Sequence, residues 1–300
     1  MNRALEMSET TQPEVIAVSF QKGGTGKTFT ALNLAGGLAA RGFDVLLIDL
    51  DPQGSLTANL GKREVYEDID QLSLDNVLLD VNKWSEINEI ILKDHEEFDL
   101  IPSNTTFNGN KTPLDSADAG ENRLGKVIEQ IDQDYHFIVC DCPPDLSAYS
   151  KNAVTAGENV IVPMQPRSEM IHSANLLFDH YETLAMMHSL EIEYLAFTMT
   201  YDSTKLTKEK RKVIDWFEDT FDEKGVLVDD RAAFDRAKWN QASIYTHSEA
   251  VENDQFPVFD QVVQHVLEQT SPPDHDVDLK HARNMSTEEL RERIKEAPEA

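Results

Sequence analysis

The sequence is poor in basic residues. Its 300 residues include 27 Lys and Arg against 55 Asp and Glu, which gives a formal net charge of −28 at pH 7. A charge of this size favours solubility and repels DNA, so any contact with DNA requires a local basic cluster. It is also typical of proteins adapted to a high-salt cytoplasm, although 16 of the 27 basic residues are lysine and such proteins often favour arginine. Mimicry of a nucleic acid is a third and less favoured interpretation.

Cysteines and long apolar runs are also scarce. The two cysteines, Cys140 and Cys142, lie on one expected strand, which argues against a disulfide framework or an iron–sulfur centre and leaves them as packing residues. No run of about 18 apolar residues is present, so we expect no membrane-spanning helix. Residues 1–13 lack the apolar core of a signal peptide and are expected to form a flexible leader. These absences favour a cytoplasmic location.

What the chain does contain is a regular alternation of apolar and amphipathic segments. Apolar runs typical of buried strands cover residues 15–20, 44–52, 98–102, 136–141, 159–164, 194–200 and 225–230. Segments with helical spacing cover residues 28–42, 83–92, 121–133, 169–189, 207–221 and 258–269. This alternation predicts an α/β fold, in which a mostly parallel, twisted sheet is covered by helices on both faces.

Two segments do not fit this pattern. Residues 103–120 are polar and contain glycine, and we expect a mobile surface loop there. From Ser271 the chain becomes polar and charged. We expect residues 271–300 to form an acidic tail, either disordered or a short helix, that lies outside the core. The globular domain is therefore expected to span residues 14–270.

The segment FQKGGTGKTFT, residues 20–30, lies between the first expected strand and the first expected helix. Gly26, Lys27 and Thr28 match the end of the phosphate-loop pattern GxxxxGK[ST], whereas Gln21 stands at the first glycine position. In such a loop the backbone N–H groups and the helix N-terminus hold phosphates, the lysine reaches the β- and γ-phosphates, and the hydroxyl binds Mg²⁺. The sequence therefore predicts a P-loop NTPase-like site for a nucleoside triphosphate.

A second lysine, Lys22, precedes the glycines, where it would crowd the same phosphates as Lys27. The form KGGxGK[ST] resembles the ParA/MinD superfamily of deviant Walker A ATPases, in which this additional lysine crosses a dimer interface to the partner's nucleotide. The resemblance assigns that role to Lys22, whose charge would meet the transferring phosphoryl group. It implies catalytic roles for both lysines and an ATP-binding loop made of Lys22, Gly23, Gly24, Thr25, Gly26, Lys27, Thr28 and Phe29.

Three carboxylates lie at the ends of expected strands. Asp49 and Asp51 lie in LLIDLDPQG, and Asp141 lies in FIVCDCPP. Because open α/β sheets bind ligands at the carboxyl ends of their strands, we expect these side chains near the phosphates. By the resemblance, Asp49 lies near the water shell of Mg²⁺, Asp51 orients the attacking water, and Asp141 is the Walker B residue that holds Mg²⁺ through water. Since Mg²⁺ keeps several waters, Thr28, Asp49 and Asp141 form a reasonable metal-binding set.

The resemblance covers about residues 14–265. It includes VIVPMQP (160–166), TMTYDSTKLT (198–207, with one apparent insertion) and DDRAAFDRAKWNQASIY (229–245). Together these segments favour the ParA/Soj branch, the partition ATPases, over the MinD branch. The sequence departs from the family's pattern at two places, and both concern contacts on the base side of the nucleotide. Phe29 stands where the family commonly has threonine, and QPRSEM stands where Q-P-E-Y is more usual.

Membrane and DNA binding can be weighed against each other. MinD-like proteins end in a basic amphipathic helix, whereas EELRERIKEAPEA has five glutamates and only Leu290 and Ile294 as large apolar anchors, which disfavours a membrane role.

ATP-bound dimers of the family bind DNA non-specifically through surface lysines and arginines. The alternative for any basic run is an ordinary solvated helix face. Two clusters supply the candidate DNA contacts, which are Lys205, Lys208, Lys210, Arg211 and Lys212, then Arg231, Arg236 and Lys238.

The resemblance implies a Mg²⁺- and ATP-dependent ATPase with weak intrinsic activity. It further implies a homodimer formed on ATP binding, non-specific binding to double-stranded DNA and stimulation by a ParB-like centromere-binding partner. Such a protein would segregate plasmid or chromosomal DNA and associate with the nucleoid. The alternative is a scaffold that positions a protein cargo or a cell-surface machine with the same ATP switch. A metal-cluster carrier or reductase ATPase would need further cysteines.

Overall fold

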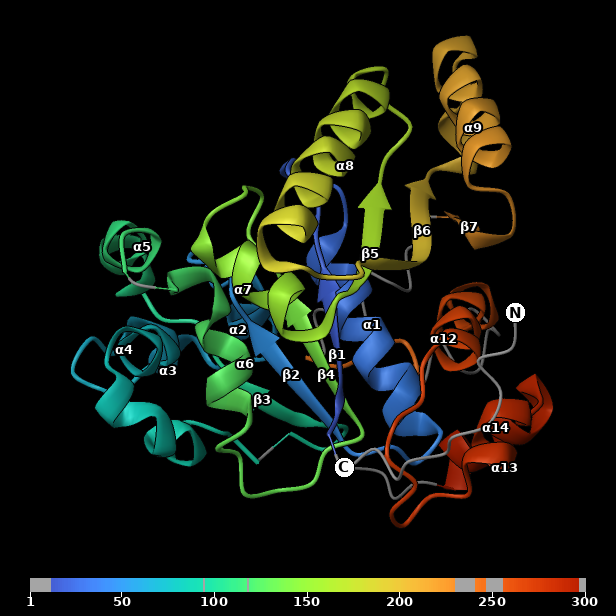
Figure 1. Ribbon diagram of the computed structural model, residues 1–300. Coiled ribbons are helices and arrows are strands. Elements are labelled where there is room, and N and C mark those ends of the chain that lie inside the picture. Colours follow the sequence, from blue (N-terminus) through green and yellow to red (C-terminus); the bar gives the residue numbers. More distant parts are fainter. Residues whose placement is uncertain (1–11, 94, 118, 230–240, 247–255, 297–300) are drawn as a thin grey trace.

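One parallel sheet organises the chain. The computed structural model describes residues 12–93, 95–117, 119–229, 241–246 and 256–296. In this part of the chain seven strands pair in the order β3-β2-β4-β1-β5-β6-β7 (Figure 1). The strands are β1 (Glu14–Val18), β2 (Val45–Asp49), β3 (Asp99–Ile101), β4 (Phe137–Asp141), β5 (Asn159–Met164), β6 (Glu193–Tyr201) and β7 (Gly225–Asp229). The α/β prediction is confirmed, and each predicted strand is present.

The strand order explains where a ligand can bind. The chain passes from β1 to β2 on one side of the sheet, and later enters β5, which pairs with the other edge of β1. The direction of the strand order therefore reverses beside β1, and a crevice forms outside the carboxyl ends of the strands at such a point. Strands β2 and β4 are fully buried, as expected for apolar strands covered on both faces.

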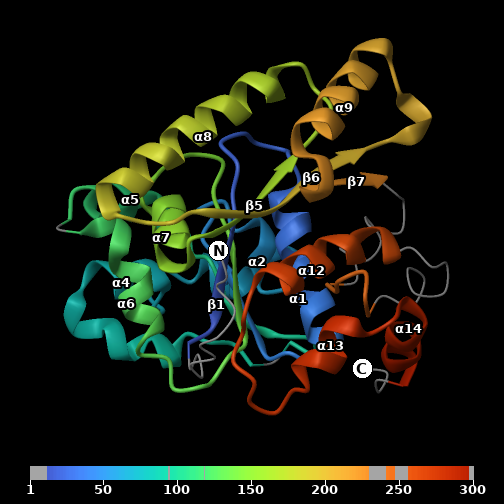
Figure 2. The same cartoon turned by 45° about the vertical axis from the view of Figure 1, so that its right-hand side comes forward.

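Two layers of helices cover the sheet. One face is covered by α1 (Lys27–Ala40), α2 (Ser55–Asn59), α12 (Pro257–Gln269), α13 (Leu279–Asn284) and α14 (Thr287–Glu296). Figures 1 and 2 both show α12, α13 and α14 gathered beside α1. The other face is covered by α4 (Leu74–Leu79), α5 (Phe107–Asp115), α6 (Arg123–Ile128), α7 (Ala148–Gly157), α8 (Glu169–His188) and α9 (Lys208–Phe221).

Short elements join these layers. They are α3 (Arg63–Glu67) and the 3₁₀ helices η1 (Val81–Glu89), η2 (Gly120–Asn122), η3 (Ser203–Lys205) and η4 (Asp222–Lys224). The helical pattern predicted over 83–92 thus corresponds to a 3₁₀ helix, and that over 121–133 to η2 followed by α6. No helix in the described ranges is long and apolar enough to cross a bilayer.

The expectation of a mobile loop over residues 103–120 is wrong. Half of this segment forms α5, whose Phe107 and Leu114 are fully buried in the core. Phe107 stacks on Tyr149 of α7, with ring centroids 5.0 Å apart. Two apolar anchors in a polar segment, with Pro113 inside the helix, gave too weak a periodic signal for a helix to be predicted.

The C-terminal segment is also more integrated than expected. We expected it to lie outside the core, yet Leu290 of α14 is fully buried, and Ala282 and Met285 are almost so. These side chains belong to the same apolar cluster as α1 and α12. Beneath them, Arg41 at the end of α1 forms a buried ion pair with Asp260 of α12, with an N–O distance of 2.7 Å. The face of the sheet that carries α1 is therefore completed by the end of the chain.

Candidate functional site

The phosphate loop joins β1 to α1 at the reversal point of the sheet. Gly24 and Gly26 have φ angles of +69° and +99°, in the left-handed region that side chains other than glycine rarely adopt. The helix begins directly afterwards, at Lys27, so its N-terminal N–H groups face the loop. This strand–glycine loop–helix arrangement is the context in which backbone N–H groups bind phosphate.

The two lysines of the loop have different surroundings. Lys27 is buried, and its Nζ donates a hydrogen bond to the main-chain oxygen of Lys22 at 3.1 Å, an oxygen that the Thr25 hydroxyl also approaches at 3.4 Å. Lys22 is only half-buried, and its ammonium group makes no hydrogen bond or ion pair within the described part of the chain. Lys27 thus turns back onto its own loop, whereas Lys22 remains available to a group from outside.

The predicted carboxylates meet at the carboxyl end of the sheet. Strands β2 and β4 are neighbours, and their register places Asp49 directly beside Asp141. Asp51 follows two residues later and lies close enough to Lys27 for their charges to interact. The structure therefore brings Lys27, Asp49, Asp51 and Asp141 together around the phosphate loop.

Asp49 is held mainly by Thr57, to which the sequence analysis assigned no role. Its Oδ2 accepts hydrogen bonds from the Thr57 hydroxyl at 2.6 Å and the Thr57 backbone N–H at 2.8 Å, and its Oδ1 accepts one from the Asp51 N–H at 3.1 Å. Ser103 completes the network, because its N–H donates to the Thr57 hydroxyl and its own hydroxyl donates to the Asp51 main-chain oxygen. The only hint in the sequence was the position of Thr57 in the polar segment after Asp51.

Asp141 differs from Asp49 in making no well-formed hydrogen bond to the part of the chain that the structure describes. Its side chain is 1% exposed, and neither carboxylate oxygen has a described residue within normal hydrogen-bonding geometry, although the Thr28 hydroxyl is close enough to oppose the rise of its pKa. A buried carboxylate without a partner is costly, so such an atom needs a ligand. Oxygen ligands held partly through water suit Mg²⁺, and the hydroxyl-bearing Thr28 lies at the start of α1 in the same crevice. The residues present therefore fit the magnesium ion that a P-loop site uses.

The electrostatics of the cluster favour the same conclusion. Burial raises the pKa of Asp49 to about 7, against the hydrogen bonds from Thr57, and burial also raises the pKa of Asp51. Burial, together with the charge of Asp49, raises the pKa of Asp141 well above its usual range. Burial lowers the pKa of Lys27, although Asp141 and Asp51 oppose that shift. One buried ammonium does not balance three carboxylates, and an added cation would lower the carboxyl pKa values.

The phosphate loop is attached to α8 at two points. The Ser19 hydroxyl and the Tyr181 hydroxyl are hydrogen-bonded at 2.6 Å and buried. The Gln21 side-chain amide donates to the main-chain oxygen of Ser173 at 3.1 Å. Gln21, which replaces the first glycine of the usual pattern, therefore anchors the start of the loop to a helix.

A cavity lies beside the phosphate loop, at the ends of β5 and β6. Its volume is about 190 Å³, and its lining comprises Gln165, Pro166, Arg167, Thr200, Tyr201, Asp202 and Lys210. Thr200 also lies near Gly26, which places the cavity next to the loop. Phe29, which stands where the family commonly has threonine, packs edge-on against Phe259 of α12, with ring centroids 5.6 Å apart.

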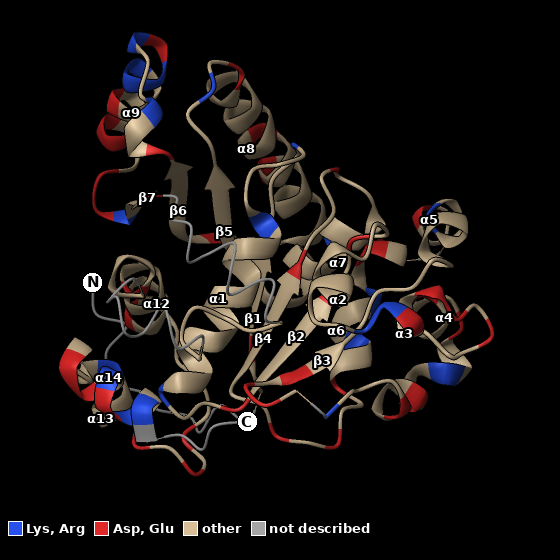
Figure 3. Ribbon diagram, turned by 180° about the vertical axis from the view of Figure 1, so that it is seen from behind, with Lys and Arg blue, Asp and Glu red and all other residues tan. Residues whose placement is uncertain are grey.

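The first basic cluster lies at the beginning of α9. In the ribbon of Figure 3, most of the blue on this helix lies toward one end, and red continues toward the other. Lys208, Arg211 and Lys212 are exposed, whereas Lys210 is half-buried and lines the cavity beside the phosphate loop. Lys205 is exposed and paired with Asp202 at 2.6 Å. The second predicted cluster, Arg231, Arg236 and Lys238, lies outside the described residues.

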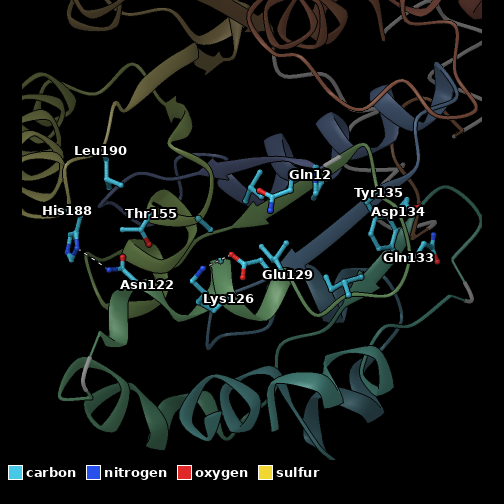
Figure 4. A pocket seen from close by; sticks show the side chains of 16 residues that line it. Gln12, Asn122, Lys126, Glu129, Gln133, Asp134, Tyr135, Thr155, His188 and Leu190 are labelled. Carbon is cyan, nitrogen blue, oxygen red and sulfur yellow. Dashed lines mark hydrogen bonds and ion pairs between the residues drawn. The ribbon is translucent and has the colours of Figure 1, made fainter. Parts of the chain in front are cut away.

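A further cavity is remote from these residues. Its volume is about 510 Å³, and it lies between α6, α7 and the residues that precede β1 (Figure 4). His188, at the end of α8, lines it and pairs with Glu121 at 3.1 Å. None of the predicted site residues lines this cavity.

The comparison with protein families agrees with this geometry. A family model described as an AAA domain matches residues 13–192, which include the phosphate loop and all three carboxylates. Relatives of this chain include Soj, the sporulation initiation inhibitor protein of Bacillus subtilis, which is 34% identical over 192 residues, or 61% of this chain and 73% of that protein. This chain belongs to the ParA/Soj family of partition ATPases.

Other similar proteins support the assignment. The chromosome partitioning protein ParA of Caulobacter vibrioides is 32% identical over 200 residues, covering 65% of this chain and 73% of that protein. Among solved structures, cobyrinic acid a,c-diamide synthase from Mycobacterium smegmatis, with a bound ATP analogue and magnesium, has a TM-score of 0.63 and 28% identity. That likeness covers 77% of this chain and 91% of the other, and it is consistent with the use of Mg²⁺ and ATP by this P-loop family.

Proposed function

We propose that this chain is a Mg²⁺- and ATP-dependent ATPase that dimerises on ATP binding and segregates plasmid or chromosomal DNA. The observation that supports this most is the pair of lysines in the phosphate loop. Lys27 is buried and directed back at its own loop, whereas the ammonium of Lys22 has no partner in the described chain. An ammonium without a partner, on a phosphate-binding loop, suits a negative charge that arrives with a second subunit.

ATP binding would use the groups that the loop already presents. The backbone N–H groups of residues 22–29 and the N-terminus of α1 would hold the phosphates. Lys27 would exchange its hydrogen bond with the Lys22 carbonyl for the β- and γ-phosphates. The cavity lined by Pro166, Arg167 and Thr200 is next to the loop and would receive the base side of the nucleotide.

Hydrolysis would depend on the three carboxylates. Bound Mg²⁺ would supply positive charge to the phosphoryl oxygens, with Thr28, Asp49 and Asp141 as the residues that hold it. Asp51 would orient the attacking water, because it is more exposed than Asp49 and Asp141 and lies beside Lys27. Thr57 would keep Asp49 in place by its two hydrogen bonds. Lys22 would act on the partner's nucleotide, where a cation supplied in trans stabilises the transition state.

DNA binding is supported by the placement of charge on α9. Its first turns hold Lys208, Arg211 and Lys212, where the helix dipole is positive, and its later turns hold acidic residues such as Glu218 and Asp219. Basic residues near the N-terminus and acidic residues near the C-terminus of a helix both oppose its dipole. Each such charge costs about 0.3–1 kcal/mol of stability. A basic cluster at the less favourable end of a helix, in a chain of net charge −28, is better explained by an anionic partner than by stability.

The test is retention of a DNA duplex by the protein with ATP, with ADP and without nucleotide, over a series of salt concentrations. We expect retention with ATP only, and an affinity that falls with salt by a log–log slope of about −0.9 for each phosphate neutralised. Charge reversal of Lys208, Arg211 and Lys212 to Glu should reduce retention without changing ATP-dependent dimerisation. Lys210 is left unchanged because it lines the cavity beside the phosphate loop.

A matched control separates the cluster from the net charge. Arg63, Lys126 and Lys280 are exposed and lie away from α9, so their reversal to Glu changes the net charge equally. Equal loss of DNA binding in both variants would argue against the α9 contact. Stimulation of hydrolysis by a DNA-site-binding, ParB-like protein would support partition. ATP-dependent dimers that never retain DNA would instead indicate a scaffold that positions a protein cargo or a cell-surface machine.

A further inference from the structure

A second cluster of charged and ligating side chains lies at the opposite end of the sheet from the phosphate loop. Asp44 immediately precedes β2 and His136 immediately precedes β4, and these two strands are paired neighbours. The backbone N–H of His136 donates to the main-chain oxygen of Asp44 at 2.9 Å, which fixes the two residues side by side. His275 comes from the segment between α12 and α13 and stacks on His136, with ring centroids 4.0 Å apart.

The hydrogen bonds of the two histidines define which nitrogen carries the proton. His136 Nε2 lies 2.8 Å from the main-chain oxygen of His275, and His275 Nε2 lies 3.1 Å from that of Asp134. A carbonyl oxygen only accepts, so both Nε2 atoms must donate, and both Nδ1 atoms bear the lone pair. A histidine whose outer N–H donates to a carbonyl is the usual arrangement in metal sites, because that bond orients the ring.

The lone pair of His136 lies near the Asp44 carboxylate, and His275 lies close to both. His136 Nδ1 is 3.3 Å from Asp44 Oδ2, and one ligand atom from each of Asp44, His136 and His275 lies within 4.8 Å of the others. Ligand atoms about 3.3–3.5 Å apart are what bonds of about 2.0–2.1 Å at a tetrahedral ion require. His136 Nδ1 also accepts the Asp44 N–H at 2.9 Å. A bound cation would displace this N–H, which belongs to an exposed residue.

The surroundings favour a cation. A shallow polar cavity of about 150 Å³ adjoins Asp44 and gives a path from solvent, and its lining includes Glu96, Glu97 and Asp99. The negative potential of these carboxylates would concentrate cations at the cavity.

We propose that Asp44, His136 and His275 bind a divalent transition-metal ion of the Zn²⁺ class, with water in the remaining position. Two imidazoles and one carboxylate suit Zn²⁺, Co²⁺ or Ni²⁺ and not Mg²⁺, which prefers oxygen ligands. The ion would join the segment that contains His275 to the starts of β2 and β4. It would thereby hold the connection to α13 and α14, which complete one face of the core. This site is independent of the proposed ATPase function.

The test uses the full chain, stripped of metal by a chelator and kept without nucleotide. Zn²⁺ affinity is measured by competition with a chromophoric chelator, and Co²⁺ binding by its visible absorption, both with Mg²⁺ present in excess. We expect one Zn²⁺ per chain, and a visible absorption of bound Co²⁺ that is typical of nitrogen and oxygen ligands. His275→Ala should weaken Zn²⁺ binding at least tenfold. Removal of a residue that only hydrogen-bonds to a metal ligand lowers metal affinity 10–100-fold, and removal of the ligand itself should cost no less.

Two control variants and a second ligand variant test whether the ion binds at this site. His281→Ala removes an exposed histidine nearby in sequence, which pairs with Glu289, and should leave the affinity within about twofold. Asp141→Asn should also leave it unchanged, because Asp141 is at the other end of the sheet. Asp44→Asn is a nearly isosteric change at an exposed side chain, and it provides a second ligand test if His275→Ala does not fold. Absence of stoichiometric binding, or binding that neither His275→Ala nor Asp44→Asn weakens, would overturn the proposal.

A thermal measurement gives an independent readout. A ligand that binds only the folded state stabilises it by about 2.7 kcal/mol at a hundredfold excess over its Kd. Zn²⁺ should therefore raise the Tm of the unmodified chain and of His281→Ala, and should not raise that of His275→Ala. An equal rise in all three proteins would place the ion elsewhere and overturn the assignment.

Discussion

The two ends of the strand pair β2 and β4 differ in how their charged and polar side chains are hydrogen-bonded. At the carboxyl end, Asp49 lies beside Asp141, and the second of these is buried with no hydrogen-bond partner among the described residues. At the amino end, Asp44 lies beside His136, and both ring nitrogens of the histidine are hydrogen-bonded. One register therefore produces an end whose buried carboxylate lacks a hydrogen bond and an end whose histidine is already hydrogen-bonded, where a metal ion would have to replace one of those bonds. Changes at the carboxyl end should act on nucleotide chemistry, and changes at the amino end on stability.

The largest effect should come from Lys27→Ala at the carboxyl end. Removal of the buried ammonium takes away the positive charge that would meet the β- and γ-phosphates, so ATP affinity should fall about a hundredfold or more. Isothermal titration with ATP and Mg²⁺ measures this directly. Retained tight binding would remove the assignment of residues 22–29 as a phosphate loop.

Lys22→Ala should separate binding from turnover. Because Lys22 is assigned to the partner's nucleotide, the variant should bind ATP normally and lose partner-dependent hydrolysis by about a thousandfold. Single-turnover hydrolysis and sedimentation with ATP measure the two properties in parallel. Loss of ATP binding in this variant would mean that both lysines serve one nucleotide.

Asp51→Ala should preserve ATP-dependent dimers while slowing turnover. Loss of the group that orients the attacking water is expected to lower kcat about a hundredfold, with KM little changed. The check is steady-state phosphate release together with the oligomeric state in ATP. Normal hydrolysis in the variant would contradict the role of Asp51.

Thr57 allows a finer change at the same end. Thr57→Val removes the hydroxyl that donates to Asp49 at 2.6 Å but retains the backbone N–H bond, so we expect kcat to fall about tenfold. Thr57→Ser keeps the hydroxyl and should restore most of the rate. If serine and valine behave alike, packing rather than the hydrogen bond positions Asp49.

The smallest effect on nucleotide chemistry should come from the amino end. Tyr135 precedes β4 there and donates a hydrogen bond to Asp99 Oδ2 at 2.5 Å. Tyr135→Phe should reduce the free energy of unfolding by about 1–3 kcal/mol and leave the Kd for ATP within about twofold. Urea unfolding and nucleotide titration of the same samples test both statements. A large loss of ATP affinity would show that the two ends of the sheet are coupled.

The strands and the phosphate loop were predictable because their signals are local. Apolar runs such as that of β2 and the glycines before Lys27 need only neighbouring residues to be recognised. The resemblance also predicted roles for Asp49 and Asp141, but their position side by side depends on the pairing of β2 with β4, which no local pattern specifies.

The remaining features depend on tertiary contacts. Thr57 and Ser103 are ordinary polar residues in sequence and acquire a role only where the chain returns to Asp51. Leu290 looked like an isolated apolar residue in an acidic tail, and the apolar surface of α1 and α12 buries it. Asp44, His136 and His275 are so far apart in sequence that only the completed sheet brings them together.

The attachment of the phosphate loop to α8 has a mechanical consequence. With its 20 residues, this helix is about 30 Å long, and Ser173 and Tyr181 connect it to the loop and to the end of β1. A tilt of about 5° at Ser173 would displace His188, about 22 Å away along the axis, by about 2 Å. His188 lines the remote cavity of Figure 4. Through this helix, a small rearrangement at the phosphate loop would produce a larger displacement at the remote cavity.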